Sequence, residues 1–346
     1  MKQSVHNILY PLLKLLPHRC CNKLKMLGNI LVSDWRMDGF PPIALTERMS
    51  HAAAREYFAE LDDESLAALD WIYLASSLYI PPERQGYYFF DHSQLTKTTR
   101  EKRKAMRECQ RQFQRRYGIS NAEFEVCYYQ HGLKMLPNAV VDYIRGKDFL
   151  DIGAYAGESS LVFMDYSPRR VIAFEPSAKS RRAYARNLAA AKVTPERYRL
   201  EPFALGESAG KMNFNDSGAV NTSPCVPGND CCEVLTLDSY TTGKSLRIGF
   251  IKADVEGMGL AVVKGALQTL QRDRPVLSLA VYHNASELFD AYALLKQQLS
   301  GYVFHLRLLN DVVLLRELAL IAYPKELVAD DNSSPQQTKE KHATAR

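Results

Sequence analysis

The sequence predicts an α/β fold: a doubly wound, mostly parallel seven-stranded sheet with an antiparallel final hairpin, preceded by a mainly helical N-terminal region. Two observations predict it. From Phe149 onward, short β-rich runs alternate with helical stretches, which is typical of a parallel sheet covered by helices on both faces. The last two apolar runs instead follow one another closely, which favours an antiparallel ending.

The composition is that of an ordinary globular protein, with 46% hydrophobic and 24% charged residues in a chain of 346. Its seven cysteines form no C-x-x-C pair and no Cys/His spacing suited to zinc, so we expect a reduced, cytoplasmic protein. No run reaches the roughly 18 to 20 apolar residues of a membrane-spanning helix.

The N-terminal apolar stretch, residues 6–18, is interrupted by Pro11, Lys14 and Pro17 and lacks a small-residue cleavage site. We therefore do not interpret it as a signal peptide. An amphipathic helix on a membrane surface is the alternative to packing on the protein's own body, so peripheral membrane contact stays open.

The region before residue 146 has helical patterns. Residues 62–80 predict a helix that Asp62 or Asp63 can cap and that ends before Pro81. Between residues 97 and 116, nine Lys/Arg face only two acids.

Within this basic segment, Met106, Cys109, Phe113 and Tyr117 recur at helical spacing, which predicts an amphipathic helix with one buried stripe. The basic outer face is either a solvated surface or a platform for acidic glycans, phosphorylated substrates or lipid headgroups. Nucleic acid is the least favoured partner.

Seven β-rich runs then predict the strands of the sheet. They span residues 149–152, 171–176, 197–205, 249–256, 276–283, 302–309 and 312–323. Asn310-Asp311 is the predicted turn of the closing hairpin, and the polar stretch 326–346 is a predicted disordered tail. The chain thus divides into a helical region 1–145, a sheet domain 146–325 and the tail.

The first strand runs into a glycine turn, "FLDIGAYAGESS". In a doubly wound sheet such a turn takes the cofactor, and Gly153 and Gly157 allow a tight turn and a close approach of the ligand. A dinucleotide site has G-x-G-x-x-G, but Ala154 stands at its second glycine. Asp151 and Glu158 would repel a pyrophosphate and attract a cationic ligand, so S-adenosylmethionine fits this turn better than NAD.

The next two strands add candidate cofactor contacts. Glu175 ends the second strand, at the position where a carboxylate can accept both ribose hydroxyls. Phe203 and Ala204 follow the third strand and are placed to flank an adenine ring.

The fourth strand runs into three charged residues, Lys252, Asp254 and Glu256, which alternate and so point to one face. Lys252 could simply pair with one of the carboxylates as a structural ion pair. Asp254, Glu256 and His283, at the end of the fifth strand, are candidate general bases for methyl transfer to a hydroxyl. Asp254 and Glu256 could instead hold a divalent cation; the sequence leaves this undecided and we assign no metal ligand.

Taken in order, "FLDIGAYAGESS", "VIAFEPS", "LTLDSY", "IKADVEGMGLAVVKGA" and "PVLSLAVYHN" resemble the successive motifs of the FkbM family of S-adenosylmethionine-dependent methyltransferases, over residues 146 to 324. The resemblance implies a class I methyltransferase fold and usually O-methylation, often of sugars in surface polysaccharides or in natural-product tailoring. It implies the methionine-binding turn at Asp151, Gly153 and Gly157, the ribose acid at Glu175, and the family's D-x-E-G at Asp254, Glu256 and Gly257.

Two positions depart from the family pattern. Members often have an acid where this chain has Gly259, and many have a glutamate in the fifth strand where it has Ala280. Both departures concern substrate contacts more than the cofactor.

Together these features predict an S-adenosylmethionine-dependent O-methyltransferase that acts on a hydroxyl of a sugar or polysaccharide precursor, with a small molecule or glycan as acceptor and the N-terminal region helping to select it. One alternative is a methyltransferase-like binding or scaffold protein without turnover. A nucleic-acid methyltransferase is less favoured, because "ADVEGMG" lacks the Asn/Asp-Pro-Pro-aromatic run that holds a flipped base. The sequence does not indicate an oligomeric state.

Overall fold

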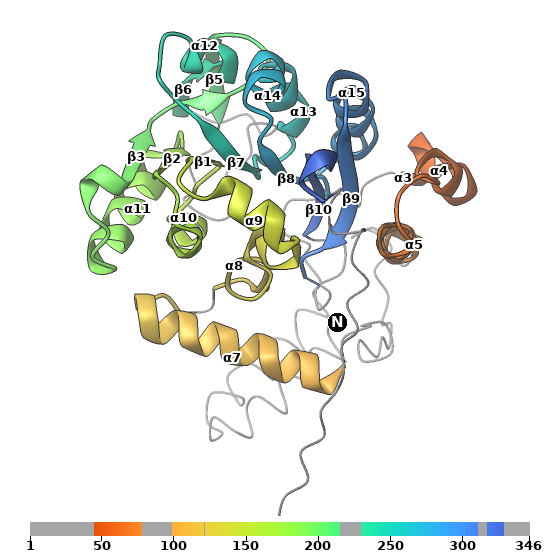
Figure 1. The fold of residues 1–346 in the computed structure, drawn as a ribbon, viewed down its shortest axis with the longest axis horizontal. Helices are drawn as coiled ribbons and strands as arrows, with labels where there is room; N and C mark the ends of the chain where they lie inside the picture. The colour runs from red at the N-terminus through yellow and green to blue at the C-terminus, as the bar shows by residue number, and fades with distance from the viewer. Residues whose placement is uncertain (1–44, 78–98, 121, 215–229, 311–316, 329–346) are drawn as a thin grey trace, which may run out of the picture.

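The computed structural model describes residues 45–77, 99–120, 122–214, 230–310 and 317–328 (Figure 1). The N-terminal stretch 6–18 lies outside the described residues. So does the predicted tail, except for residues 326–328, which belong to a short 3₁₀ helix and its end.

The sheet prediction is confirmed: seven strands form one sheet in the order β3-β2-β1-β7-β8-β10-β9. The strands are β1 (Asp148–Ile152), β2 (Arg170–Phe174), β3 (Tyr198–Glu201), β7 (Ile248–Ala253), β8 (Val276–Ala280), β9 (Tyr302–Leu308) and β10 (Leu318–Pro324). The first five pair in parallel, and β10 runs antiparallel between β8 and β9. The chain order reverses between β1 and β7, and ligands bind at such a switch point.

The closing hairpin exists, but its predicted turn is wrong. Leu308 pairs with Leu318, and the Leu309 amide donates to the Glu317 carbonyl at 2.7 Å. The connection is therefore longer than Asn310-Asp311, and the strand predicted from residue 312 begins at Leu318. Residues 311–316 lie outside the described ranges.

The predicted strand 197–205 is in fact two strands in two sheets. β3 ends at Glu201, and β4 (Ala204–Leu205) joins a three-stranded sheet with β6 (Asp230–Leu235) and β5 (Gly210–Phe214), in the order β4-β6-β5. Pro202 stands between them, and proline has no N–H to continue the hydrogen-bond ladder.

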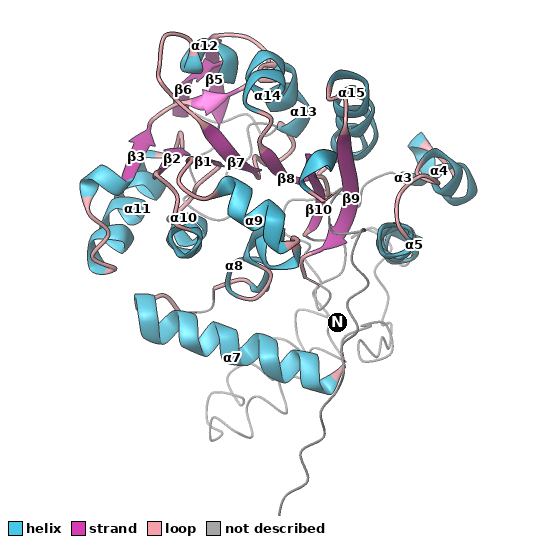
Figure 2. Cartoon of the chain, in the orientation of Figure 1, coloured by secondary structure: helices cyan, strands magenta, loops and turns pink. Residues whose placement is uncertain are grey.

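Helices cover both faces of the large sheet (Figures 1 and 2). They are α3 (Leu45–Arg48), α4 (His51–Tyr57), α5 (Asp63–Ser77), α7 (Arg100–Tyr117), α8 (Phe124–Cys127), α9 (Asn138–Ile144), α10 (Glu158–Phe163), α11 (Ala178–Ala190), α12 (Leu237–Thr241), α13 (Gly259–Lys264), α14 (Leu267–Asp273) and α15 (Ala291–Gln298), with short turns η2 (Gln130–Met135), η3 (Met164–Tyr166), η4 (Pro195–Arg197), η5 (Ser286–Asp290) and η6 (Lys325–Leu327).

Alternate strand residues supply the two cores. Leu150 of β1 packs in the cluster that includes α12 to α15, whereas Phe149 packs with α9 and α10 on the opposite face. This alternation follows from the pleat of the strand, and it explains why the strands are apolar throughout.

The described part of the N-terminal region is helical, as predicted. Asp62 caps α5, since its Oδ1 accepts a hydrogen bond from the Ser65 amide at 2.8 Å. α4 packs against α15, with the rings of Phe58 and Tyr292 4.8 Å apart. No helix within the described ranges is both long enough and apolar enough to traverse a bilayer.

The predicted amphipathic basic helix is α7, which begins after the N-cap Thr99 and ends at Gly118 in the left-handed conformation. Met106 and Phe113 are buried, while Cys109 and Tyr117 are partly buried. The stripe packs toward α8 and α10, so the helix is fixed next to the glycine turn of the sheet domain.

Candidate active site

A cavity of about 270 Å³ lies at the carboxyl ends of β1, β2 and β7. Three elements close it: the glycine turn after β1, the small sheet β4-β6-β5, and the chain between α7 and α8, which supplies Ile119, Ser120, Ala122 and Glu123. Its position at the switch point of the sheet makes it the candidate active site.

Seven of the ten predicted site residues line this cavity, and three do not. The lining residues are Gly153, Glu158, Glu175, Phe203, Ala204, Asp254 and Glu256. Asp151, Gly157 and His283 lie behind the cavity wall and contact other side chains.

The two glycines of the turn have different surroundings. Gly153 has φ of +77°, and a Cβ there would lie 1.9 Å from the Asp254 carbonyl oxygen. The turn therefore lies directly against the end of β7. Gly157, with φ of +90°, faces Tyr184 and Leu188 of α11 rather than the cavity, so it allows helix packing and not ligand approach.

Asp151 is fully buried and has structural partners. Lys252 Nζ lies 3.4 Å from Asp151 Oδ1 and donates to the Gly153 carbonyl at 2.8 Å, while the Ser160 hydroxyl donates to Asp151 Oδ2 at 2.6 Å. Burial raises the pKa of Asp151, and Lys252 opposes the rise. The ion pair of Lys252 is thus with Asp151 on the neighbouring strand, and it fixes the glycine turn.

Glu175 is held with its carboxylate at the cavity. Its Oε2 accepts the Tyr155 amide and its Oε1 accepts the Ser177 amide, both at 2.8 Å. Each oxygen retains a second lone pair for a ligand hydroxyl. Burial raises the pKa of Glu175 to about 7, although the two backbone amides oppose that rise.

An apolar wall faces Glu175. Phe203 and Ala204 line it together with Met212 and Phe214 of β5. The small sheet, which the sequence did not predict, therefore completes the surface proposed for an adenine ring.

The cavity lining is strongly acidic. Six carboxylates and a single amine line it: Glu123, Glu125, Glu158, Glu175, Asp254, Glu256 and Lys252. Burial and the neighbouring Asp151 raise the pKa of Glu158. Since Lys252 is held by Asp151 and Gly153, the described lining favours a cationic ligand over a phosphate.

His283 is buried among three acids behind the cavity. Its Nε2 lies 3.3 Å from Asp254 Oδ1 and 3.6 Å from Glu256 Oε2, and its Nδ1 lies 2.9 Å from Glu287 Oε2. Burial by itself would lower the pKa of His283, but Asp254 and Glu287 raise it to about 10. Burial by itself would raise the pKa of Asp254, but the hydrogen bond from His283 and the charge of Lys252 hold it below its usual range.

The segment that carries Asp254 and Glu256 is fixed from the end of β8. Glu256 has a left-handed backbone, with φ of +54°. Asn284 Nδ2 donates to the Gly257 carbonyl at 3.0 Å, and the Gly259 amide donates to Glu287 Oε1 at 2.8 Å. Both carboxylates therefore have defined positions at the cavity.

The two departures from the family pattern have structural counterparts. A Cβ at Gly259 would lie 2.8 Å from Glu287 Oε1, so Glu287 occupies the space beside that glycine. Ala280 borders a second, small cavity of about 10 Å³, which Glu125 and Glu317 also line. At both positions, where family members often have an acid and this chain does not, a carboxylate from another element lies nearby.

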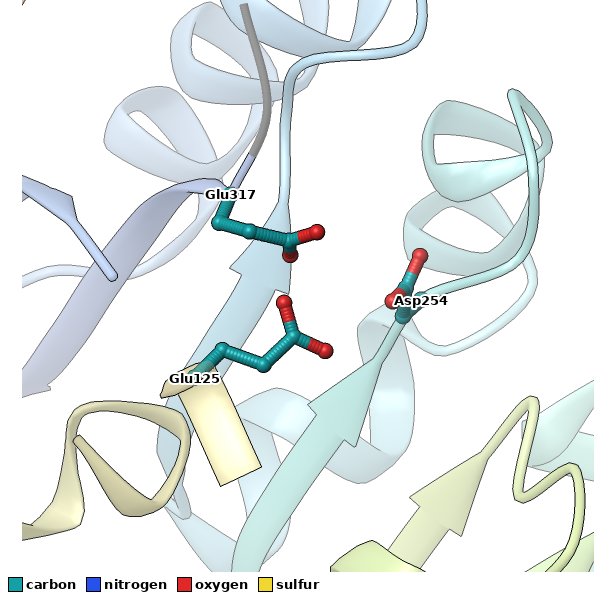
Figure 3. Close-up of side chains that lie close together, drawn as sticks. All are labelled: Glu125, Asp254 and Glu317. Carbon is teal, nitrogen blue, oxygen red and sulfur yellow. The ribbon is translucent and has the colours of Figure 1, made fainter. Parts of the chain in front are cut away.

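Glu125, Glu317 and His131 line the small cavity beside the candidate active site and were not predicted from the sequence. Figure 3 shows the carboxylates of Glu125, Asp254 and Glu317 pointing toward one another, and each offers an oxygen within 4.8 Å of the others. They come from α8, the end of β7 and the start of β10, which are distant in sequence. The one signal available was an acid inside the apolar, aromatic run "FEVCYY".

The chain is similar to known methyltransferases in sequence pattern and in fold. The family model described as the methyltransferase FkbM domain matches residues 151–306. Among solved structures, methyltransferase FkbM from Methylobacillus flagellatus KT aligns with a TM-score of 0.51 and 18% identity, over 78% of this chain and 57% of that chain. This chain thus spans little more than half of that protein, and the similarity shows the fold.

A second solved structure is the O-methyltransferase TomG from Streptomyces achromogenes, which is involved in tomaymycin synthesis and was solved in complex with SAM. It is 13% identical to this chain, and the alignment covers 67% of this chain and 92% of that chain. The TM-score of this alignment is 0.38. No curated protein matches the chain.

Proposed function

Residues 151–306 of this chain form an FkbM methyltransferase domain, and from that premise we propose that the protein transfers the methyl group of S-adenosylmethionine to a hydroxyl of a sugar or polysaccharide precursor. The observation that carries this proposal is the carboxylate of Glu175 at the end of β2, held by two backbone amides at the edge of an acidic cavity.

The cofactor is proposed to lie along the ends of β1 and β2. Glu175 would accept the ribose hydroxyls, as an acid does at this place in doubly wound folds. Phe203 and Ala204 would flank the adenine. Gly153 lets the turn lie against β7 and lines the cavity, where its backbone would contact the methionine part, and Glu158 would attract the ammonium group.

The acidic lining supports a sulfonium cofactor over a dinucleotide. A pyrophosphate would meet six carboxylates and one amine, and that amine is engaged with Asp151 and Gly153. S-adenosylmethionine carries no phosphate, and its two cationic groups gain from the same field.

The transfer is an in-line displacement. The acceptor oxygen bonds to the methyl carbon while the carbon–sulfur bond breaks and its electron pair stays on sulfur, which leaves the neutral thioether. The hydroxyl proton passes to a carboxylate, and Asp254 and Glu256 are the candidates that line the cavity. Both ring nitrogens of His283 face acids, and the protonated ring has no free lone pair that could accept the proton. His283 therefore acts as a positioning residue for these carboxylates.

The acceptor is proposed to contact the N-terminal region. Ile119, Ala122, Glu123 and Val126, from the chain around α8, line the cavity opposite the glycine turn. Carboxylates such as Glu123 accept hydrogen bonds from hydroxyl groups, which suits a sugar. The described cysteines are free thiols, and we propose that the enzyme acts in the cytoplasm.

The proposal is tested by incubating the protein with methyl-labelled S-adenosylmethionine and a panel of acceptors, namely monosaccharides, nucleotide sugars and oligosaccharides. We expect the label to enter at least one acceptor as an ether that withstands alkali. Asp254→Asn should reduce the rate by at least about a hundredfold, the loss usual for a general base. Glu207→Gln, on the surface, should leave the rate unchanged. Label in alkali-labile esters or in nucleic acid would contradict the proposed acceptor class.

A further inference from the structure

We propose that Glu125, Asp254 and Glu317 form a binding site for one divalent cation beside the cofactor cavity, with His131 next to them on the same small cavity. The three carboxylates converge from α8, β7 and β10 (Figure 3), and each offers an oxygen within 4.8 Å of the other two. Ligand oxygens held at about 2.1 to 2.5 Å from one cation lie at most about 5 Å apart, so the spacing suits a single ion.

Two buried polar atoms at this place have no hydrogen-bond partner within the described residues. They are Glu125 Oε2, in a residue that is 8% exposed, and His131 Nε2, in a residue that is 5% exposed. Both residues line the small cavity that Asp254 and Glu317 also line. Buried polar groups nearly always have a partner, and a cation would supply one for both atoms.

Two positive groups described near the cluster have other partners. Lys252 contacts Asp151 and the Gly153 carbonyl, and His283 contacts Asp254 and Glu287. Within the described residues neither group forms an ion pair with Glu125 or Glu317, so a bound cation would supply positive charge to these two carboxylates.

The donor set indicates the class of cation. Carboxylate oxygens suit Mg²⁺, Ca²⁺ and Mn²⁺, whereas an imidazole nitrogen favours transition metals. Three carboxylates with one imidazole are therefore best matched by Mn²⁺, with Zn²⁺ as the main competitor. The small cavity, at about 10 Å³, has room for about one ion or water molecule.

Asp254 lines both cavities, so a cation on its carboxylate would lie at the wall of the proposed active site. There it could bind an acceptor hydroxyl and lower its pKa. This role rests on the proposed function, whereas cation binding itself does not.

Binding is tested with protein stripped by a chelator and titrated with MnCl₂, with free Mn²⁺ followed by electron paramagnetic resonance. We expect one Mn²⁺ per chain. Glu317→Gln and, separately, Glu125→Gln should each weaken it at least about tenfold. Glu207→Gln is the matched control, because it removes a surface carboxylate that pairs with Lys264 and lines neither cavity, and it should bind as the wild type does. His131→Ala should weaken Zn²⁺ more than Mg²⁺, measured by competition against Mn²⁺.

The absence of stoichiometric Mn²⁺, Mg²⁺, Ca²⁺ or Zn²⁺ binding to folded protein would overturn the site and leave protons as the charge balance. Binding that survives both glutamine substitutions would place the ion elsewhere and overturn it as well. Circular dichroism verifies that each variant is folded. Calorimetry with S-adenosylhomocysteine on the same samples reports cofactor binding separately, so failure of the cation site and failure of the proposed function are distinguishable.

Discussion

His283 and Asp254 form a buried contact, with His283 Nε2 3.3 Å from Asp254 Oδ1, while Glu287 faces the other ring nitrogen at 2.9 Å. An imidazole between two carboxylates is stabilised in its charged form. A residue that looks like a general base in the sequence is therefore better interpreted as the cation that holds two acids in place.

Replacing His283 with leucine should destabilise the protein by about 3 to 5 kcal/mol at pH 7, because buried carboxylates lose their partner. The pKa of His283 rises from 6.5 to about 10 on folding. The stability that His283 contributes to the folded protein is thus fully present below about pH 6.5 and is lost as the pH rises to 10. Urea unfolding of both proteins should show a free-energy gap that is largest near pH 6, shrinks steadily between about pH 6.5 and pH 10, and is smallest above pH 10.

A gap of constant size from pH 6 to pH 10.5 would contradict a charged His283. His51→Leu is the control, because His51 pairs with Asp70 on the surface. Loss of that pair should cost less than about 1 kcal/mol.

The pH dependence of ligand binding should report Glu175. Its folded-state pKa is raised to about 7, and ribose hydroxyls donate to the ionised carboxylate. The affinity for S-adenosylhomocysteine should therefore be constant above about pH 8 and fall by about tenfold for each unit below pH 7. Glu175→Gln should bind weakly, with a flatter profile measured in the same buffers. If the wild type and the variant have parallel profiles, Glu175 does not bind the ligand as an anion.

Lys252→Met should leave Asp151 buried beside an apolar side chain and cost about 3 to 5 kcal/mol of unfolding free energy. The double variant that combines Lys252→Met with Asp151→Asn should lose less unfolding free energy than the two single variants lose together. The difference should be about 0.5 to 3 kcal/mol, because the two residues share one ion pair. Denaturant unfolding of the four proteins of this cycle gives the coupling. Simple additivity would show that the pair does not stabilise the turn.

Gly153→Ala tests the close packing of the turn. Gly153 and Gly243 both have left-handed backbones, with φ of +77° and +71°. A Cβ at Gly243 meets nothing within 4 Å, whereas at Gly153 it would lie 1.9 Å from a backbone oxygen. Gly243→Ala should cost only the left-handed penalty of about 1 to 2 kcal/mol and leave ligand binding intact.

Gly153→Ala should cost more than Gly243→Ala and abolish ligand binding, as measured by thermal unfolding and calorimetry. Equal effects of the two substitutions would show that the turn has room to adjust.

Local patterns were enough to predict the large sheet and to place the candidate residues Glu175 and Asp254 at one edge of it. Glu175 and Asp254 each directly follow an apolar strand, and the strand ends of a parallel sheet meet at one edge. The sequence could not show that Asp151 faces Lys252, or that Glu125 and Glu317 reach Asp254, because these neighbours are set by strand order and by packing of distant segments.

The small sheet β4-β6-β5 was missed for a different physical reason. Pro202 interrupts the run 197–205, and this local signal was outweighed by the apolar pattern around it. The long connection between β9 and β10 was missed for a similar reason, since Arg316 and Glu317 interrupt the apolar run 312–323 just before β10 begins, and this signal was outweighed by the apolar residues on both sides.

Binding of S-adenosylmethionine in the acidic cavity through Glu175 is the proposal on which the others depend. It is tested by calorimetric titration of S-adenosylmethionine and S-adenosylhomocysteine into the wild type and Glu175→Ala, with NAD as control. We predict micromolar binding of both ligands to the wild type, loss of that binding in Glu175→Ala, and no binding of NAD. Well-folded wild-type protein that binds neither methionine-derived ligand would contradict the claim and favour a methyltransferase-like scaffold.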